Sequence, residues 1–345
     1  MTRKSIPRAA GSAATTGATD SAELAIGLSA AILAVTAEVP LVLIVHPFDG
    51  DRAVAASDRA SSRNPVLDTL PFGPLDPSGD RTLERALRGW VRAQTGFELG
   101  YAEQLYTFAD RDRFLGEQDG VRVVSVAYVA LVREARPAGE AEWRGCYEYL
   151  PWEDWRGGRP QMLDREIEPA LRRWASAGAE SERRDRAEIA FGLGGAPWDP
   201  DRVLDRYELL YEAGLVAEAS RDRRDARASP SVSVRALGRP MAFDHRRILA
   251  TALGRLRGKL RYRPVVFELL APTFTLLQLQ QVVEALAGAR LHKQNFRRLV
   301  EKGGLVEGTG RVESNTGGRP AELFRFRREV LRERPAPGVV LRAGR

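Results

Sequence analysis

The sequence contains little cysteine and little histidine. Of its 345 residues, one is cysteine, Cys146, and three are histidine: His46, His245 and His292. A single cysteine cannot form an intramolecular disulfide, and thiolate and imidazole ligands are too few for a dedicated zinc site. We therefore expect no metal and no other cofactor, and we interpret Cys146 as a buried residue without a chemical role.

The sequence also lacks a long hydrophobic run. Its most apolar stretch, residues 24–37, is followed by Glu38 and Pro40, and it is shorter than the roughly 20 residues that a helix needs to span a bilayer. A polar segment with Asp20 and Glu23 separates this stretch from the basic residues near the N-terminus, which is not the pattern of a signal peptide. These absences predict a cytoplasmic protein.

Positive charge is concentrated at one end of the chain. Residues 246–345 contain 21 Lys and Arg against 8 Asp and Glu, a net charge of +13, whereas residues 1–245 carry a net charge of −6. This asymmetry indicates that only the C-terminal part meets a polyanion such as DNA, and phosphate neutralisation would make that binding fall steeply with salt.

The N-terminal half alternates strand-like and helix-like segments. Residues 1–22, rich in Ala, Ser, Thr and Gly without periodicity, predict a disordered tail. We predict strands at 24–36, 41–45, 105–108 and 121–132, and helices within 70–100 and at 162–174. Their order predicts an α+β fold, specifically an α/β/α sandwich.

A glycine loop followed by a helix, residues 73–97, resembles a Nudix box. In such a box, glutamates on the helix hold Mg²⁺ and activate water for attack on a diphosphate. With Gly96 taken as the late glycine of the box, the glutamate positions fall on Arg81, Trp90, Ala93 and Gln94. Because Mg²⁺ needs oxygen ligands, we expect no catalytic residue and no metal here, although three carboxylates lie nearby: Asp76, Asp80 and Glu84.

Residues 176–242 predict a helical connector with a flexible loop. Asp199 and Pro200 form a helix-entry signature, and Gly214 ends that helix. Residues 221–227 mix Arg with Asp and predict an exposed loop. A helix over 243–256 follows and is expected to join the two halves of the chain, with His245 as a hydrogen-bonding residue at its start.

The stretch 259–326 has three helical patterns followed by a glycine-rich hairpin pattern, the order typical of a winged helix-turn-helix. In the middle helix, Thr275 and Gln278 predict a capping box, and Gly288 is the stop signal. The third helix, 291–302, has a wide polar face, which on an isolated helix would indicate only exposure to solvent. Followed by a hairpin, it predicts DNA contacts from His292, Lys293, Gln294, Asn295, Arg297, Arg298, Lys302 and, at the tip of the wing, Arg319.

The altered box and the C-terminal stretch together resemble the Nudix-related transcriptional regulators of NAD metabolism, the NrtR-like family. The segments that carry the resemblance are YRPVVFELL, FTLLQLQQVVEALAG, HKQNFRRLVEKGGLVE and GGRPAELFRF. The resemblance covers residues 24–174 and 243–328, with a connector that is longer than usual, as in a variant of alphaproteobacterial type. It implies a homodimeric repressor that binds double-stranded operator DNA and senses an NAD-derived nucleotide, commonly ADP-ribose, in a Nudix domain that has lost or nearly lost hydrolysis.

For that nucleotide, aromatic and cationic side chains after the box are the candidate ligand-binding residues: Tyr106, Phe108, Arg111, Arg113 and Arg122. A solvated loop at 110–113 is the simpler interpretation of part of this set. The chain is expected to divide into a tail (1–22), a degenerate Nudix-like sensor (23–175), the connector (176–242), the winged helix (243–330) and a second disordered tail (331–345).

Two other functions stay open from the sequence alone. An active Nudix hydrolase of ADP-ribose-like nucleoside diphosphates, with an accessory winged helix, would turn over ADP-ribose in the presence of Mg²⁺. A DNA-binding protein whose sandwich only dimerises would bind no nucleotide.

Overall fold

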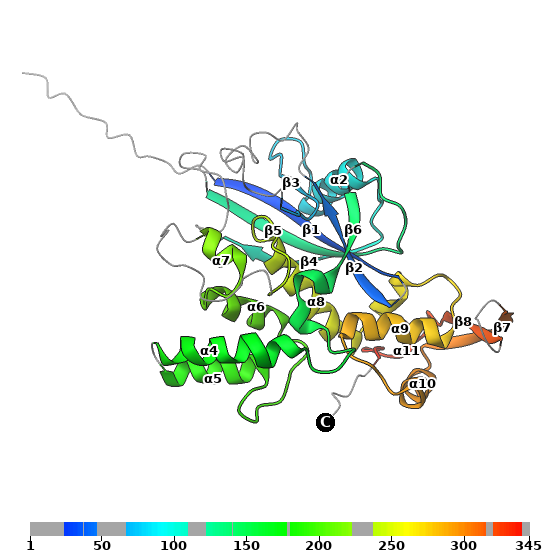
Figure 1. Ribbon diagram of the computed structural model, residues 1–345. Helices are drawn as coiled ribbons and strands as arrows, with labels where there is room; N and C mark the ends of the chain where they lie inside the picture. Colours follow the sequence, from blue (N-terminus) through cyan, green and yellow to red (C-terminus); the bar gives the residue numbers. More distant parts are fainter. Residues whose placement is uncertain are drawn as a thin grey trace, which may run out of the picture.

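The computed structural model describes residues 24–36, 38–46, 67–109, 122–139, 141–177, 180–222, 237–314 and 320–339. A twisted sheet lies above a layer of helices, and a smaller C-terminal domain extends to one side (Figure 1). Within these ranges no helix is both long enough and apolar enough to cross a membrane. The tail predicted at residues 1–22 lies outside them.

The sheet is mixed and contains the predicted strands. Its described strands are β1 (Leu24–Thr36), β2 (Val39–Val45), β3 (Phe72–Pro74), β4 (Tyr101–Phe108), β5 (Arg122–Leu131) and β6 (Ala141–Gly145). Their order is β4-β5-β1-β2-β6, with β3 paired to β1; β1 and β5 run parallel, and the other pairs are antiparallel. The strand predicted to begin at residue 105 begins at Tyr101.

One face of the sheet is covered by α2 (Leu83–Thr95), the helix of the altered box. Thr82 caps it by accepting a hydrogen bond from the Arg85 amide, and Gly96 ends it with a left-handed φ of 74°, as predicted. Leu87 and Val91 are fully buried against the sheet. The predicted loop followed by a helix is therefore confirmed.

On the opposite face, α3 (Cys146–Tyr149), α8 (His245–Leu260) and α9 (Leu276–Ala287) contact the strands. The helical elements between α3 and α8 form a further layer, which packs on α8 through α6. They are the 3₁₀ turn Pro151–Glu153, the π-helical turn Leu163–Ile167, α4 (Glu168–Ser176), α5 (Glu180–Phe191), α6 (Val203–Glu212) and α7 (Ala217–Asp222). The single helix predicted at 162–174 is thus a π-helical turn followed by α4. Pro169, which has no amide hydrogen to continue the α-helical ladder, lies in the first turn of α4.

Two predictions about the connector are wrong. The helix expected to start at Pro200 starts at Val203, because the Asp199 carboxylate accepts from the Asp201 amide at 3.0 Å and closes a turn before it. Arg221 is not in an exposed loop but at the end of α7, where it donates to the carbonyls of Met241 and Phe243. Residues 223–227 lie outside the described ranges.

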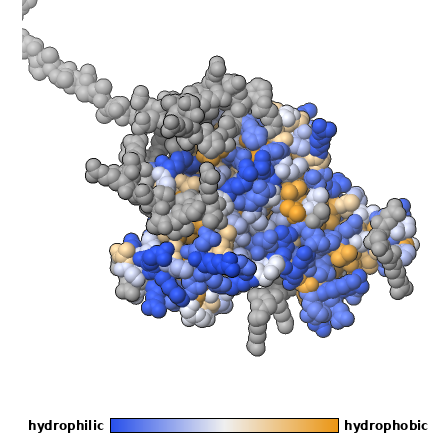
Figure 2. All heavy atoms as spheres, in the orientation of Figure 1, coloured by the Kyte–Doolittle hydropathy of each residue, from blue (hydrophilic) through white to orange (hydrophobic). Residues whose placement is uncertain are grey.

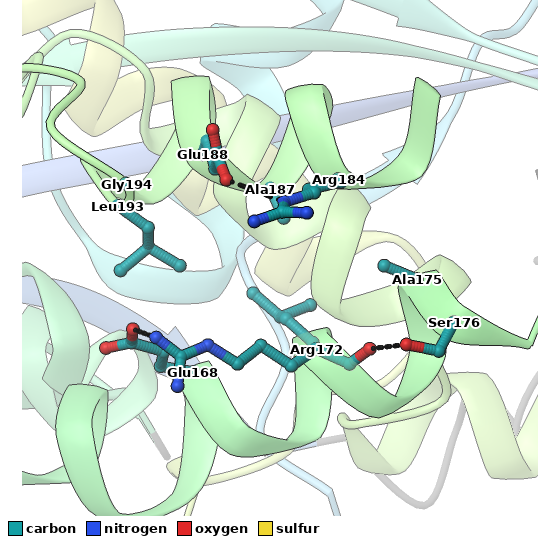
Figure 3. Close-up of a pocket in the computed structure, with 10 residues that line it drawn as sticks. Glu168, Arg172, Ala175, Ser176, Arg184, Ala187, Glu188, Leu193 and Gly194 are labelled. Carbon is teal, nitrogen blue, oxygen red and sulfur yellow. Dashed lines mark hydrogen bonds and ion pairs between the residues drawn. The ribbon is translucent and has the colours of Figure 1, made fainter. Parts of the chain in front are cut away.

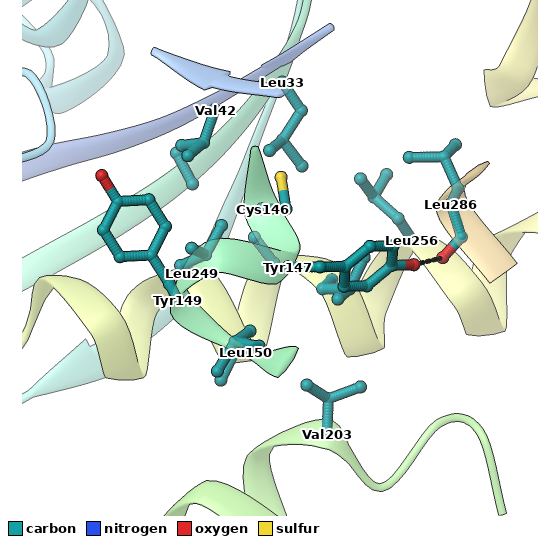
Figure 4. Packing of buried hydrophobic residues seen from close by; sticks show 14 of the residues in the cluster. Leu33, Val42, Cys146, Tyr147, Tyr149, Leu150, Val203, Leu249, Leu256 and Leu286 are labelled. Atoms are coloured by element: carbon teal, nitrogen blue, oxygen red, sulfur yellow. Dashed lines mark hydrogen bonds between the residues drawn. The ribbon is translucent and has the colours of Figure 1, made fainter. Parts of the chain in front are cut away.

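The long helix α8 (His245–Leu260) joins the two halves, as expected. Ile248, Leu249, Leu253 and Leu256 are fully buried. Figure 4 shows Leu249 near Val42 of β2 and Tyr149 of α3, and Leu256 near Tyr147 and Leu286. At its start, His245 accepts a hydrogen bond from the Leu70 amide at 3.0 Å. Burial, with Arg221 nearby, lowers the pKa of His245 to about 3, so the ring stays neutral and can keep accepting.

The C-terminal domain is a winged helix. It comprises the 3₁₀ turn Val265–Leu269, α9 (Leu276–Ala287), α10 (Lys293–Lys302) and the hairpin β7 (Val306–Glu313) with β8 (Ala321–Phe326). The predicted capping box is present: the Gln278 amide donates to Thr275 Oγ1 at 3.2 Å, and the Thr275 amide donates to Gln278 Oε1 at 2.7 Å. Phe274 pairs through its backbone with Phe324 and so adds a third segment to the wing.

The chain continues past the wing as ordered structure. A short helix, α11 (Val330–Glu333), follows β8, and Val330 and Val339 are buried. Residues 331–339, which we expected to belong to a disordered tail, therefore pack on the domain.

Candidate functional site

The third helix of the winged helix, α10, has a narrow inner side and a wide outer face. Phe296 is 2% exposed and Val300 is fully buried, so these two side chains hold the helix against the core. The residues predicted to contact DNA from this helix and from its N-cap are all exposed: His292, Lys293, Gln294, Asn295, Arg297, Arg298 and Lys302. Figure 2 shows a largely hydrophilic surface where α10 lies.

The cations on this face are not neutralised by the described part of the chain. Arg298 donates to Asn295 at 3.4 Å, and no described carboxylate forms an ion pair with Lys293, Arg297 or Lys302. On the neighbouring wing, by contrast, Arg325 pairs with Glu307 at 2.6 Å. Unpaired Arg and Lys beside Asn and Gln provide donors for both phosphates and base edges.

The wing contributes a basic residue that sequence reasoning missed. Arg319, the predicted tip residue, lies outside the described ranges, and β7 instead displays an exposed Arg311 after Gly310, whose φ is 70°. Its neighbour Val312 is 59% exposed. The signal was available, because a basic residue directly follows a glycine of the predicted hairpin loop.

The turn that precedes α10 is fixed to the Nudix-like half. The Gly288 carbonyl accepts from the Trp155 amide at 2.7 Å, and the Tyr147 hydroxyl donates to the Ala285 carbonyl at 2.7 Å. Gly288 has a φ of 68°, and a Cβ there would collide with Glu153 and Arg257. Only glycine combines this backbone conformation with such a close approach, so the start of α10 is held at a defined position relative to α3.

Beneath this turn lies a fully buried ionic cluster, the Glu153 triad, formed by Glu153, Arg206 and Arg257. Arg206 binds the carboxylate with two hydrogen bonds of 2.6 and 2.9 Å, and Arg257 binds it at 2.5 Å. Burial raises the pKa of Glu153, but the two guanidinium groups outweigh this effect and the pKa lies below its ordinary value. Arg257 also donates to the Leu286 carbonyl at 3.1 Å, so the triad joins α6, α8 and the end of α9.

A second link runs between the sheet and the same turn. Glu38, at the β1–β2 turn, accepts from Arg290 at 2.6 Å and from Gln281 at 2.8 Å. Arg290 also binds Glu284 at 2.8 Å. Glu38 has a φ of 68°, a conformation that costs a residue other than glycine free energy, and these bonds hold it there.

In the altered Nudix box, two of the side chains at the glutamate positions, Trp90 and Gln94, tie the helix to the strand before it, whereas Arg81 and Ala93 are exposed. Trp90 lies over Gly73, where an added Cβ would collide with its ring, and its Nε1 donates to the Pro74 carbonyl at 2.9 Å. Gln94 donates to the Phe72 carbonyl at 2.7 Å and accepts from the Phe72 amide at 3.1 Å. These contacts tie α2 to β3 and leave an indole and an amide where Mg²⁺ would need carboxylates.

The three carboxylates near the box are already engaged. Asp80 accepts from the Asp76 amide at 2.9 Å, and Asp76 accepts from the Ser78 amide at 2.8 Å. Glu84 pairs with Arg88 at 2.8 Å. Among the described residues, no three His, Cys, Asp or Glu side chains are grouped so that they could hold a metal ion.

Only some of the candidate nucleotide-binding residues lie within the described ranges. Tyr106 and Phe108 lie with ring centroids 5.3 Å apart; Tyr106 is 58% exposed, whereas Phe108 is buried beneath the guanidinium of Arg247. Arg111 and Arg113 lie outside the described ranges. For Arg122 the structure gives the strand position, opposite Leu24.

A pocket of about 300 Å³ lies elsewhere, between α4 and α5 (Figure 3). Leu171, Ala187 and Leu193 are among its apolar lining residues. The charged side chains at the pocket pair with one another, Arg172 with Glu168 and Arg184 with Glu188. The pocket therefore presents no unpaired charge to a ligand, and it includes none of the residues singled out from the sequence.

The fold and these two sites define a class of protein, in which a winged helix with an open polar face is joined to a Nudix-like domain without the Nudix glutamates. Residues 266–326 match the family described as the NrtR DNA-binding winged helix domain. Residues 266–326 thus form an NrtR-type winged helix, which is joined to the Nudix-like domain that precedes it.

Individual proteins are similar to part or most of the chain. Over 91 residues the chain is 42% identical to the ADPR responsive transcriptional repressor NtrR of Acinetobacter baylyi; the match spans 26% of this chain and 36% of that repressor, about a third of its length. The crystal structure of Shewanella oneidensis NrtR complexed with a 27mer DNA matches 88% of this chain and 94% of that one, at 20% identity and a TM-score of 0.51. The crystal structure of Shewanella oneidensis NrtR alone matches 88% and 95%, at 20% identity and a TM-score of 0.49.

Proposed function

We propose that this chain is a transcriptional repressor of NAD metabolism genes that binds operator DNA and responds to an NAD-derived nucleotide such as ADP-ribose. The observation that carries the proposal is the outer face of α10, where Lys293, Arg297 and Lys302 have no described carboxylate partner, on a winged helix of NrtR type. The Acinetobacter relative, a repressor responsive to ADPR, supports the choice of signal.

In this proposal each part of the chain has one task. Residues 243–330 bind double-stranded DNA through α10 and the wing, residues 23–175 bind the nucleotide, and residues 176–242 connect them. The protein acts as a homodimer in the cytoplasm, where its DNA lies. Two subunits would bind two half-sites of one operator, each α10 reading one of them.

The nucleotide is assigned to the end of β4 and the start of β5. Tyr106 offers an exposed ring on which the adenine can stack. Phe108 lies beside Tyr106, and the Arg247 guanidinium lies over the Phe108 ring. Arg111, Arg113 and Arg122 are the proposed partners of the diphosphate, because guanidinium groups bind phosphate oxygens bidentately.

We also propose that the Nudix-like domain does not hydrolyse the nucleotide it binds. Trp90, Ala93 and Gln94 stand at the glutamate positions, and Trp90 and Gln94 hold α2 to β3. With ADP-ribose and Mg²⁺, at micromolar enzyme over hours, we expect no AMP above the level without enzyme, as measured by chromatography. Mg²⁺-dependent AMP release proportional to enzyme concentration would instead favour the hydrolase.

A gel shift tests the DNA-binding half of the proposal. The full chain is titrated against the region upstream of its own gene and against promoters of NAD biosynthesis genes, with an unrelated promoter as the control. We expect a shift of at least one of these fragments at a protein concentration that leaves the control unshifted. Equal affinity for all fragments would contradict a specific operator.

A further inference from the structure

The segment after the wing, residues 327–339, forms an ordered arm that is anchored at both ends. At its start the Arg327 amide donates to the Leu305 carbonyl at 3.0 Å, and the Arg327 guanidinium donates to the Gly304 carbonyl at 3.0 Å. At its end the Val339 amide donates to the Leu260 carbonyl at 2.6 Å. The arm therefore spans from the C-terminal end of α10 to the C-terminal end of α8.

The anchors rest on packing as well as on hydrogen bonds. Val330 is fully buried and Val339 is 2% exposed. Gly338 lies so close to the backbone of Arg261 and Tyr262 that a Cβ would collide with it. These contacts fix the course of the arm, along which residues 328, 329 and 331–336 are exposed.

Three of these eight exposed residues are arginines, and two, Glu329 and Glu333, are glutamates. Arg328, Arg332 and Arg334 are exposed, and no described carboxylate forms an ion pair with any of them. Arg327 alone pairs, with Glu333. Near the anchors at the two ends of the arm lie Lys302, at the end of α10, and Arg263, in the turn after α8; both are exposed and neither has a described ion-pair partner.

We propose that this arm is a second DNA contact, which holds the phosphate backbone of the duplex beyond the stretch read by α10. The inference rests on the proposed function, since the occupant is the same DNA. Two observations favour it: Arg328, Arg332 and Arg334 are exposed without a described ion-pair partner, and the arm begins with hydrogen bonds to Gly304 and Leu305, directly after α10. Arginines without Asn or Gln among them give affinity for phosphate and no choice of sequence.

The test is the salt dependence of binding by the full chain to a 40-base-pair duplex of random sequence, followed by fluorescence anisotropy. One variant carries Arg328→Gln, Arg332→Gln and Arg334→Gln. A control variant loses the same charge from the Nudix-like domain through Arg81→Gln, Arg85→Gln and Arg133→Gln, all exposed and without a described ion pair. Each lost phosphate contact lowers the slope of log affinity against log salt by about 0.9.

We expect the arm variant to lose about two to three units of this slope and at least about tenfold in affinity at low salt, equally for random and operator DNA. The control variant should keep the slope and the affinity of the unaltered protein within error. Both variants should have the same melting temperature as the unaltered protein. A slope in the arm variant equal to that of the control overturns the inference and leaves the proposed function standing. Failure of the unaltered protein to bind any duplex overturns both.

Discussion

Replacing Arg297 and Arg298 together by alanine is expected to abolish specific operator binding. Both side chains are exposed on α10, and neither forms an ion pair with a described carboxylate. Each good contact of this kind contributes roughly 1–3 kcal/mol, so affinity should fall by at least about thirtyfold. The measurement is a gel shift on the fragment that the unaltered protein binds.

The stability of the fold should hardly change when Arg297 and Arg298 are replaced. Neither side chain packs in the core, so the melting temperature should stay within about two degrees of the unaltered protein. The matched control is Arg81→Ala with Arg85→Ala, which removes two exposed arginines, one before the N-cap of α2 and one in its first turn, and should leave DNA affinity unchanged. Unaltered affinity in the α10 variant would contradict the role of this helix.

Replacing Glu153 by glutamine is expected to cost about 3–5 kcal/mol of unfolding free energy, because it leaves two buried guanidinium groups without a counter-charge. Arg206 and Arg257 are 0% and 3% exposed and cannot turn to water without disrupting α6 and α8. Urea unfolding followed by circular dichroism measures the loss.

A surface pair serves as the control for this prediction. Glu212→Gln breaks the ion pair with Arg186, in which both side chains are nearly half exposed, and should cost less than about 1 kcal/mol. If the two variants lost similar free energy, the triad would not be the buried support described here.

The Glu153 triad also predicts a dependence of stability on pH. The folded pKa of Glu153 lies below its ordinary value of 4.5, so its contribution is complete above that value and is lost as pH falls through the folded pKa. The unaltered protein should therefore lose more stability than Glu153→Gln as the pH is lowered below about 4.5.

Local sequence signals predicted the parts of this structure that depend on neighbours along the chain. The capping box of Thr275 and Gln278, the glycine stops at Gly96 and Gly288 and the polar face of α10 all depend on residues within one or two helical turns. Such spacing is set by helix geometry alone, so the winged helix could be recognised before any tertiary contact was known.

The parts that could not be predicted depend on residues far apart in the sequence. Glu153 meets Arg206 and Arg257 across 53 and 104 positions, and no local pattern links them. The role of Trp90 was hidden for the same reason: the sequence revealed the missing glutamate, but the contact with Gly73 depends on how β3 folds over α2. The Asp199 error came from reading a turn as a helix cap, since both use a carboxylate that accepts from nearby amides.

The central claim, that nucleotide occupancy and operator binding are coupled, is tested most directly by measuring operator affinity with and without saturating ADP-ribose. We predict that ADP-ribose changes the dissociation constant for the operator at least about fivefold. By linkage, calorimetry should find the affinity for ADP-ribose changed by the same factor when operator DNA is present. An operator affinity that is identical with and without ADP-ribose would contradict the account.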